Sequence, residues 1–329
     1  MTSKSNLDRE HSAAKTVVLP VLLLVLSGVA AAQVAPPTSG RDQENFRISV
    51  EVDLVVLQAT VRGREGHAVL QLGQQNFEVY EDGRTQPIRL FRHEDTPVTV
   101  GLVIDHSGSM REKLADVTAG AQAFVHSSNP NDQVFVVNFN EAVSLGLPRG
   151  VGFSDNAEQL GSAIWGAPAI GTTALYDAII EALKRLQQGT SDKKVLIVIS
   201  DGGDNASKTT LDQVLQMAEQ SSAMIYTIGI FEPDDPDRNP KVLQRLARET
   251  GGEAIFPTRL SETMEICERI ARDIRDQYTI GYSSPNERQD GSYHKVRIAA
   301  RSSDNEKLTV RARAGYRSGG AFQLSKDAK

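Results

Sequence analysis

Between residues 98 and 277, apolar segments of strand length alternate with amphipathic helical patterns, and this alternation strongly limits the folds open to the chain. The continuous apolar segments lie at 98–104, 134–139, 195–199 and 224–230. Such strands, separated by helices, are typical of a parallel sheet covered by helices on both faces. The sequence therefore predicts an α/β fold with a doubly wound, mostly parallel sheet.

The helical patterns between these strands are clear at three places. Leu114, Val117 and Phe124 share one helical face, and the apolar residues of 175–186 do the same. A last helix is predicted over 262–276. The short segment 142–147 is predicted to be an antiparallel strand at the edge of the sheet.

Segments with the two-residue period of β-strands flank this region on both sides, at 46–95 and 278–317. In the first of them, the Asp82-Gly83 pair between two apolar runs predicts a hairpin. We expect the two segments to pair into a small β-sandwich, with the α/β domain, 96–277, inserted between them. Phe91 and Tyr278 would then be neighbours.

The first 32 residues have the three parts of a secretory signal peptide. Lys15 precedes an apolar run at 17–26, and three alanines at 30–32 offer a cleavage site. The run is short for a transmembrane span, so we expect no stable membrane span after cleavage; an uncleaved signal anchor is the alternative. A linker at 33–45 and a tail at 318–329 complete the division. The sequence thus predicts an exported protein, periplasmic or secreted.

Charge and cysteine content exclude some classes of function. The net charge of −6 argues against nucleic acid as a partner, since nucleic-acid-binding proteins normally carry a strongly basic face. With Cys267 as the single cysteine, the chain can form no internal disulfide and no cysteine-based zinc site. We expect this thiol to be a small buried residue of a helix.

Five oxygen-bearing side chains stand at strand ends and a helix start. They are Asp105, Ser107 and Ser109 after the first strand, Thr173 at a helix start, and Asp201 after a later strand. Each alone could be a cap or a turn residue. Together they lie where open parallel sheets bind ligands, beyond the carboxyl ends of the strands. Carboxylates and hydroxyls suit Mg²⁺, with Mn²⁺ or Ca²⁺ as alternatives, so these residues predict a divalent metal site.

On these motifs the sequence resembles the von Willebrand factor type A (VWA) domains. The run Asp105-His106-Ser107-Gly108-Ser109, Thr173 in Gly-Thr-Thr-Ala-Leu-Tyr-Asp-Ala, and Asp201 in Ser-Asp-Gly-Gly-Asp-Asn look like the metal-ion-dependent adhesion site of that family. The resemblance covers roughly 96–277. The flanks, Phe-Glu-Val-Tyr-Glu-Asp-Gly at 77–83 and Gln-Tyr-Thr-Ile-Gly-Tyr at 277–282, are similar to those of the VWFA-related Acidobacterial domain proteins.

The resemblance implies roles for the candidate ligands. The two serines would ligate the metal directly, the two aspartates would hold it directly or through water, and Thr173 would join depending on conformation. Thr172 stands where the family often has glycine, so the ligand is either Thr172 or Thr173, and we favour Thr173. In the family, an acidic residue of a partner protein fills the open coordination position. We therefore expect an exported, non-catalytic binding or adhesion protein whose protein partner supplies a carboxylate.

Two other classes of function stay open. One is a metal-dependent hydrolase or phosphotransferase, which needs a nucleophile or a base that activates water. Ser107 stands where a second carboxylate would be, and we expect His106, the one acid–base candidate, to be a surface residue pointing away from the metal. The other is a structural scaffold that binds through the β-domain, where we expect Arg311 and Arg313 to face water.

Overall fold

The structure is a computed structural model that describes residues 54–231, 238–286 and 290–319. The predicted signal peptide and linker lie outside these ranges, as does the tail from residue 320 onwards. Within the described ranges, no helix combines the length and the apolar character needed to cross a membrane.

The α/β domain contains a six-stranded sheet in the order β10-β9-β8-β5-β6-β7. Its strands are β5 (Val98–Asp105), β6 (Gln133–Phe139), β7 (Val143–Leu145), β8 (Lys193–Ser200), β9 (Met224–Gly229) and β10 (Ala254–Ile255). All neighbours are parallel except β7, which runs antiparallel to β6 at the edge. Both the doubly wound α/β fold and the antiparallel edge strand are as the sequence predicts.

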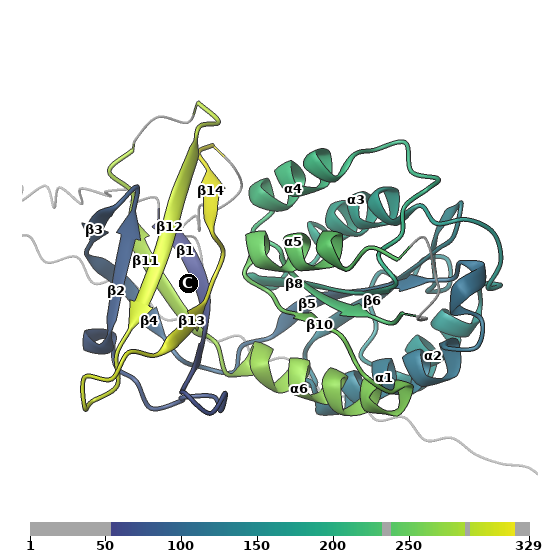
Figure 1. The fold of residues 1–329 in the computed structure, drawn as a ribbon, viewed down its shortest axis with the longest axis horizontal. Coiled ribbons are helices and arrows are strands. Elements are labelled where there is room, and N and C mark those ends of the chain that lie inside the picture. Colours follow the sequence, from purple (N-terminus) through teal and green to yellow (C-terminus); the bar gives the residue numbers. More distant parts are fainter. Residues whose placement is uncertain (1–53, 232–237, 287–289, 320–329) are drawn as a thin grey trace, which may run out of the picture. The chain divides into compact units, whose positions relative to one another are not determined.

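Helices cover both faces of this sheet (Figure 1). They are α1 (Leu114–Ser127), α2 (Ala157–Trp165), α3 (Leu175–Leu186), α4 (Leu211–Gln220), α5 (Pro240–Thr250) and α6 (Thr263–Arg275). In Figure 1, α3, α4 and α5 lie over one face, and α1, α2 and α6 over the other. Single-turn 3₁₀ helices occur at Gln74–Asn76, Gly108–Met110 and Leu260–Glu262.

The helices α1, α3 and α6 match the predicted ones, and the short helices α2 and α4 were missed. In α3, Leu175, Ile179 and Leu183 are fully buried, as their spacing predicts. The helices α2 and α4 have only nine and ten residues, which leaves little room for a repeating apolar pattern. Cys267 of α6 is buried as expected, and burial raises the pKa of its thiol to about 12.

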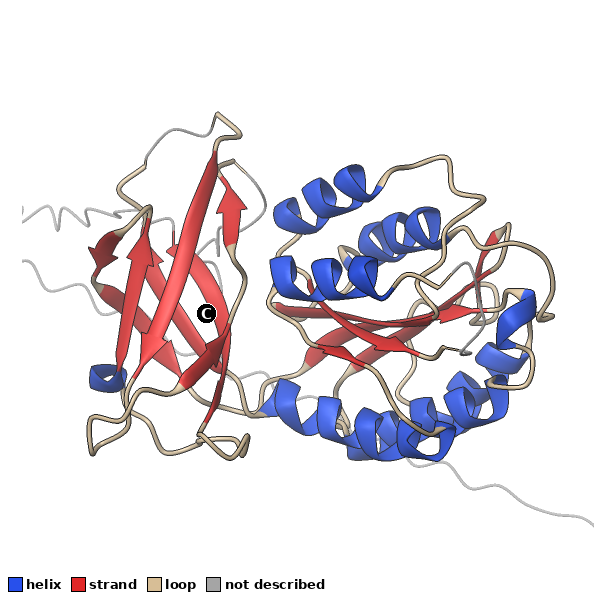
Figure 2. Ribbon diagram, in the orientation of Figure 1, coloured by secondary structure: helices blue, strands red, loops and turns tan. Residues whose placement is uncertain are grey.

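The β-domain consists of two antiparallel four-stranded sheets, shown in red in Figure 2, in the orders β13-β1-β11-β4 and β14-β12-β2-β3. The strands before the α/β domain are β1 (Leu54–Arg62), β2 (Phe77–Glu81), β3 (Arg84–Gln86) and β4 (Ile88–Arg92). Those after it are β11 (Tyr278–Ser283), β12 (Tyr293–Ala300), β13 (Thr309–Arg311) and β14 (Gly315–Arg317). Each sheet therefore mixes strands from both flanks.

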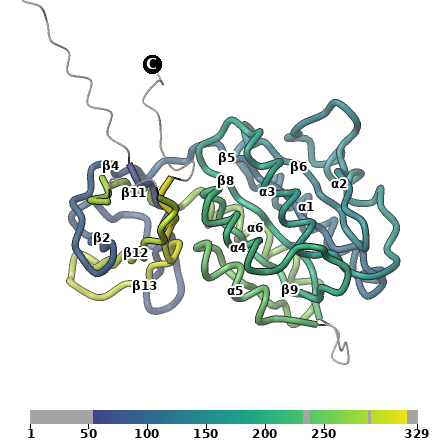
Figure 3. The backbone as a smooth tube through the Cα atoms, turned by 90° about the horizontal axis from the view of Figure 1, so that it is seen from above, coloured from purple at the N-terminus to yellow at the C-terminus, as the bar shows by residue number. Residues whose placement is uncertain are grey.

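The two sheets share one apolar core, which confirms the predicted β-sandwich. Leu57 and Ile280 of one sheet and Val79 and Ile298 of the other belong to the same buried cluster. Strands β4 and β11 pair, as Figure 3 shows from another direction, and the rings of Phe91 and Tyr278 lie 5.8 Å apart. The exact positions at which one domain gives way to the other stay a prediction.

The turn between β2 and β3 confirms the predicted hairpin, whereas one predicted surface arginine is buried. Asp82 and Gly83 have φ values of 48° and 81°, and the two-residue type I′ hairpin needs positive φ at both positions. The Arg311 side chain, which was expected to face water, is 22% exposed and pairs with Glu253 and Asp273. Arg313, which was also expected to face water, is only 7% exposed. Its Nε donates to the Gly315 carbonyl at 2.7 Å, so the alternating pattern alone gave the wrong environment.

Candidate metal centre

Parallel strands bring the predicted ligands to one edge of the α/β sheet. Asp105 is the last residue of β5 and pairs in register with Phe139, the last residue of β6. On the other side of β5, Ile104 pairs with Ile199, next to Ser200 at the end of β8. The loops that follow β5 and β8 therefore start at the same level.

Three of the five predicted residues form a continuous chain of polar contacts. The Ser107 and Ser109 hydroxyl oxygens are 3.1 Å apart, and the Ser109 hydroxyl donates to Asp201 Oδ2 at 2.7 Å. Ser107 begins the 3₁₀ turn Gly108–Met110, which brings the two serine side chains together. Adjacent ligands of an octahedral Mg²⁺ lie about 3 Å apart, because each is about 2.1 Å from the ion. The spacing of these oxygens fits one divalent ion.

The carboxylate of Asp105 is held by the protein on both oxygens. Its Oδ1 accepts from the Ser107 backbone N–H at 2.8 Å, and its Oδ2 accepts from the Ser200 hydroxyl at 2.6 Å. Burial raises the pKa of Asp105 to about 6, against the lowering effect of the Ser200 hydrogen bond and with a further rise from nearby Asp201. With both oxygens engaged, Asp105 fits a role as a charge that reaches an ion through water.

The structure distinguishes the two threonines. Thr173 is buried, and its backbone N–H donates to Asn205 Oδ1 at 2.9 Å. Its hydroxyl makes no hydrogen bond to any residue that the structure describes. Thr172 is exposed, and its backbone N–H donates to Glu141 Oε2 at 3.2 Å. A hydroxyl without a protein partner, on a buried residue, is the better candidate ligand.

The loop before these threonines depends on a glycine. Gly171 has a φ of 80°, and a Cβ atom built there would lie 1.7 Å from Glu141 Oε2. Its carbonyl accepts from the backbone N–H of Gly108 at 3.3 Å, which ties this loop to the serine-bearing turn. A side chain at this position would be strained by the positive φ and would displace the Glu141 carboxylate.

His106 is not the surface residue that the sequence led us to expect. It is fully buried, and its Nε2 lies 3.2 Å from the Oδ1 atom of Asn138. The segment after α2 covers it, since the Ile170 backbone N–H donates to the His106 carbonyl. Burial lowers the pKa of this imidazole. Its ring is thus engaged with β6.

Three residues that support this edge were not singled out from the sequence. Ser200 and Asn205 both lie within the Ser-Asp-Gly-Gly-Asp-Asn motif, so the motif could have pointed to them as parts of the site. Glu141 follows β6 in a loop with no motif, and only the fold places its carboxylate beside Gly171.

Comparison with known proteins assigns the family. The model of the von Willebrand factor type A domain matches residues 99–269, and the chain belongs to this family. VWA domains are usually non-catalytic binding modules. No curated protein matched the sequence.

Several solved structures are similar to the chain. A von Willebrand factor type A protein from Catenulispora acidiphila has 15% identity and a TM-score of 0.48, covering 86% of this chain and 76% of its own. The vWF domain of the type V pili tip protein Mfa5 from Porphyromonas gingivalis has 15% identity and a TM-score of 0.45, covering 55% and 97%. BatB from Bacteroides thetaiotaomicron has 16% identity and a TM-score of 0.44, covering 54% and 98%.

Proposed function

We propose that the chain binds a divalent ion at this edge of the sheet and uses it to hold a carboxylate of a partner protein. Ser107 and Ser109 would be direct ligands, Thr173 a further hydroxyl ligand, and Asp105 and Asp201 ligands directly or through water. Mg²⁺ is the first candidate, with Mn²⁺ or Ca²⁺ as alternatives. The observation that carries the proposal is the row of Ser107, Ser109 and Asp201 oxygens at the spacing of one ion's ligands.

A carboxylate is the ligand that such an ion would attract. Serine and threonine hydroxyls are neutral, and Asp105 and Asp201 each already accept two hydrogen bonds from the protein. A divalent ion held by these groups keeps part of its charge uncancelled, and an incoming anion is therefore bound strongly. This argument favours an exposed aspartate or glutamate of another protein.

The same geometry argues against hydrolysis or phosphoryl transfer at this edge. A general base must come within hydrogen-bonding reach of the attacking water or hydroxyl. His106 contacts Asn138 instead, and Asp105 is engaged on both oxygens. We propose a non-catalytic protein, exported after removal of the signal peptide, without a stable membrane span and without nucleic acid as a partner.

Water-proton relaxation of bound Mn²⁺ tests this proposal. Mn²⁺ with an open coordination position binds water, and we expect a short blocked peptide with one glutamate to displace that water and lower the relaxivity. The same peptide with glutamine is the matched control and should have no effect. The Ser107→Ala/Ser109→Ala double variant should lack the glutamate-sensitive signal. An equal response to both peptides, or a full response in the double variant, would refute the carboxylate-binding role.

A further inference from the structure

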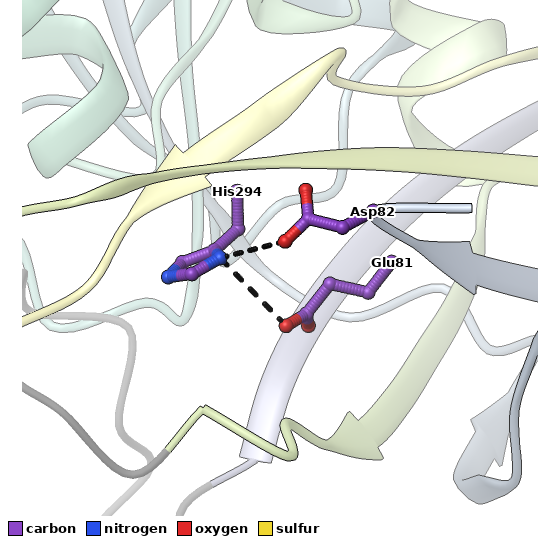
Figure 4. A group of neighbouring side chains, drawn as sticks. All are labelled: Glu81, Asp82 and His294. Carbon is purple, nitrogen blue, oxygen red and sulfur yellow. Dashed lines mark hydrogen bonds and ion pairs between the residues drawn. The ribbon is translucent and has the colours of Figure 1, made fainter. Parts of the chain in front are cut away.

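A second group of potential metal ligands lies in the β-domain. Glu81 ends β2, Asp82 opens the following turn, and His294 lies in β12. One ligand atom from each lies within 4.8 Å of the others. Figure 4 shows both carboxylates pointing toward the same ring nitrogen of His294. The positive φ of Asp82, 48°, belongs to the turn that places its carboxylate beside the histidine.

Glu81 is a buried carboxylate surrounded by neutral donors. Its side chain is 1% exposed and accepts hydrogen bonds from Tyr282, Ser284, Asn286 and Tyr316, at 2.6, 2.8, 2.6 and 3.2 Å. In the described part of the chain, no lysine or arginine forms an ion pair with it. A buried carboxylate is costly without a positive charge nearby, so a cation beside Glu81 would stabilise this group.

The hydrogen bonds around His294 favour a proton on its Nε2 atom. The hydrogen bonds from Ser292 and Ser318 lower the pKa of Asp290 to about 2, so this carboxylate only accepts. The Ser318 hydroxyl donates to Asp290, and the Ser292 hydroxyl has two oxygen acceptors in reach for its own proton, Asp290 and Ser318. Ser292 is left to accept from His294 Nε2 at 3.0 Å. Metal-bound histidines typically donate their other ring N–H in this way.

The opposite ring nitrogen, Nδ1, faces the two carboxylates. It lies 2.9 Å from Asp82 Oδ2, 4.0 Å from Glu81 Oε1 and 3.1 Å from the amide nitrogen of Asn286. A bare Nδ1 and a carboxylate oxygen at this distance repel each other unless a positive charge lies between them. One proton on Nδ1 would balance only one of the two carboxylate charges. A divalent ion would balance both and would bind all three atoms.

We propose that Glu81, Asp82 and His294 form a second metal site that takes a divalent transition ion, with Zn²⁺ the best match. Imidazole nitrogen and carboxylate oxygen are both Zn²⁺ ligands, and a site with three protein ligands leaves the fourth position to water. The oxygen-only set of the α/β domain favours Mg²⁺ instead, because imidazole suits the softer transition ions. This second site does not depend on the proposed binding of a partner.

Calorimetric titration of Zn²⁺ into the full chain tests the proposal. The Ser107→Ala/Ser109→Ala background removes the site of the α/β domain, and one saturable Zn²⁺ site should remain. His294→Gln and Asp82→Asn should each abolish it, and Ser292→Ala should weaken it about 10–100-fold because the imidazole loses its outer partner. His67→Ala is the matched control, since this β-domain histidine is 86% exposed, and it should leave binding unchanged.

Two further measurements show whether a variant loses Zn²⁺ binding because it lacks a ligand or because it is misfolded. Asp82 has a side chain that is 47% exposed, so its isosteric change to asparagine should leave the thermal unfolding curve of the metal-free protein close to that of the background. Nitrogen NMR of His294 should show Nδ1 changing on Zn²⁺ addition while Nε2 stays protonated. Absence of Zn²⁺ binding in the background, unchanged binding in either ligand variant, or an Nδ1 that stays protonated at saturation would overturn the proposal.

Discussion

The edge of the parallel sheet and the Glu81 group of the β-domain both gather carboxylates and polar side chains, but they are assembled differently. At the sheet edge, Ser107 and Ser109 lie two residues apart in one loop, and Asp201 joins them from a neighbouring strand end. In the β-domain, Asp82 meets His294 across 212 residues of sequence. The first cluster is a local motif, whereas the second exists only because two distant strands pair.

The two clusters also differ in the chemistry that they offer. The sheet edge presents hydroxyl and carboxylate oxygens, which suit Mg²⁺. The β-domain group adds an imidazole nitrogen, which suits Zn²⁺. Variants of one cluster should therefore leave the ion of the other cluster untouched.

The largest expected effect is a reciprocal loss of the two ions. Ser107→Ala/Ser109→Ala should abolish Mg²⁺ binding and leave one Zn²⁺ site, and His294→Gln should abolish that Zn²⁺ site and leave Mg²⁺ binding intact. Calorimetry of both ions in both variants measures this. Exposed Ser162→Ala is a control for the serine changes and should bind both ions like the natural chain. Loss of both ions in either variant would mean that the clusters are not independent.

A smaller effect should distinguish the two threonines of the sheet edge. Thr173→Ala removes the hydroxyl of a buried residue that has no protein partner in the described structure, and we expect Mg²⁺ affinity to fall. Exposed Thr172→Ala is the matched change and should leave the affinity unchanged. Titration of Mg²⁺ into both variants decides between them. A loss of affinity in Thr172→Ala alone would mean that Thr172, and not Thr173, is the metal ligand.

The smallest effect concerns the stability of the β-domain group without metal. Tyr282→Phe removes the hydroxyl that donates to Glu81 at 2.6 Å, leaving the buried carboxylate with one donor fewer. We expect the free energy of unfolding to fall by about 1–3 kcal/mol. Tyr80→Phe removes an exposed hydroxyl that donates to Glu78. This control should change the free energy of unfolding by less than about 0.5 kcal/mol. Equal effects in urea unfolding would argue against a stabilising role of the Tyr282 hydrogen bond to buried Glu81.

The contrast between the clusters also explains what the sequence could predict. The long strands and helices of the α/β domain carry clear apolar periods, and Asp105, Ser107, Ser109, Thr173 and Asp201 follow from strand ends and a family motif. The burial of His106 could not be predicted from the sequence, because it depends on the segment that packs over this residue. The Glu81–His294 contact depends on the register in which Val296 pairs with Glu81, and no local pattern encodes that register.

The central claim is that the α/β domain holds a divalent ion at the carboxyl edge of its sheet. Isothermal titration of Mg²⁺ into the full chain and into Asp105→Asn tests it directly, because the asparagine keeps the shape of the buried side chain and removes its charge. We predict one saturable Mg²⁺ site in the natural chain and its loss in the variant, with similar thermal unfolding of both metal-free proteins. Absence of saturable binding in the natural chain, or equal binding by the two proteins, would contradict the account.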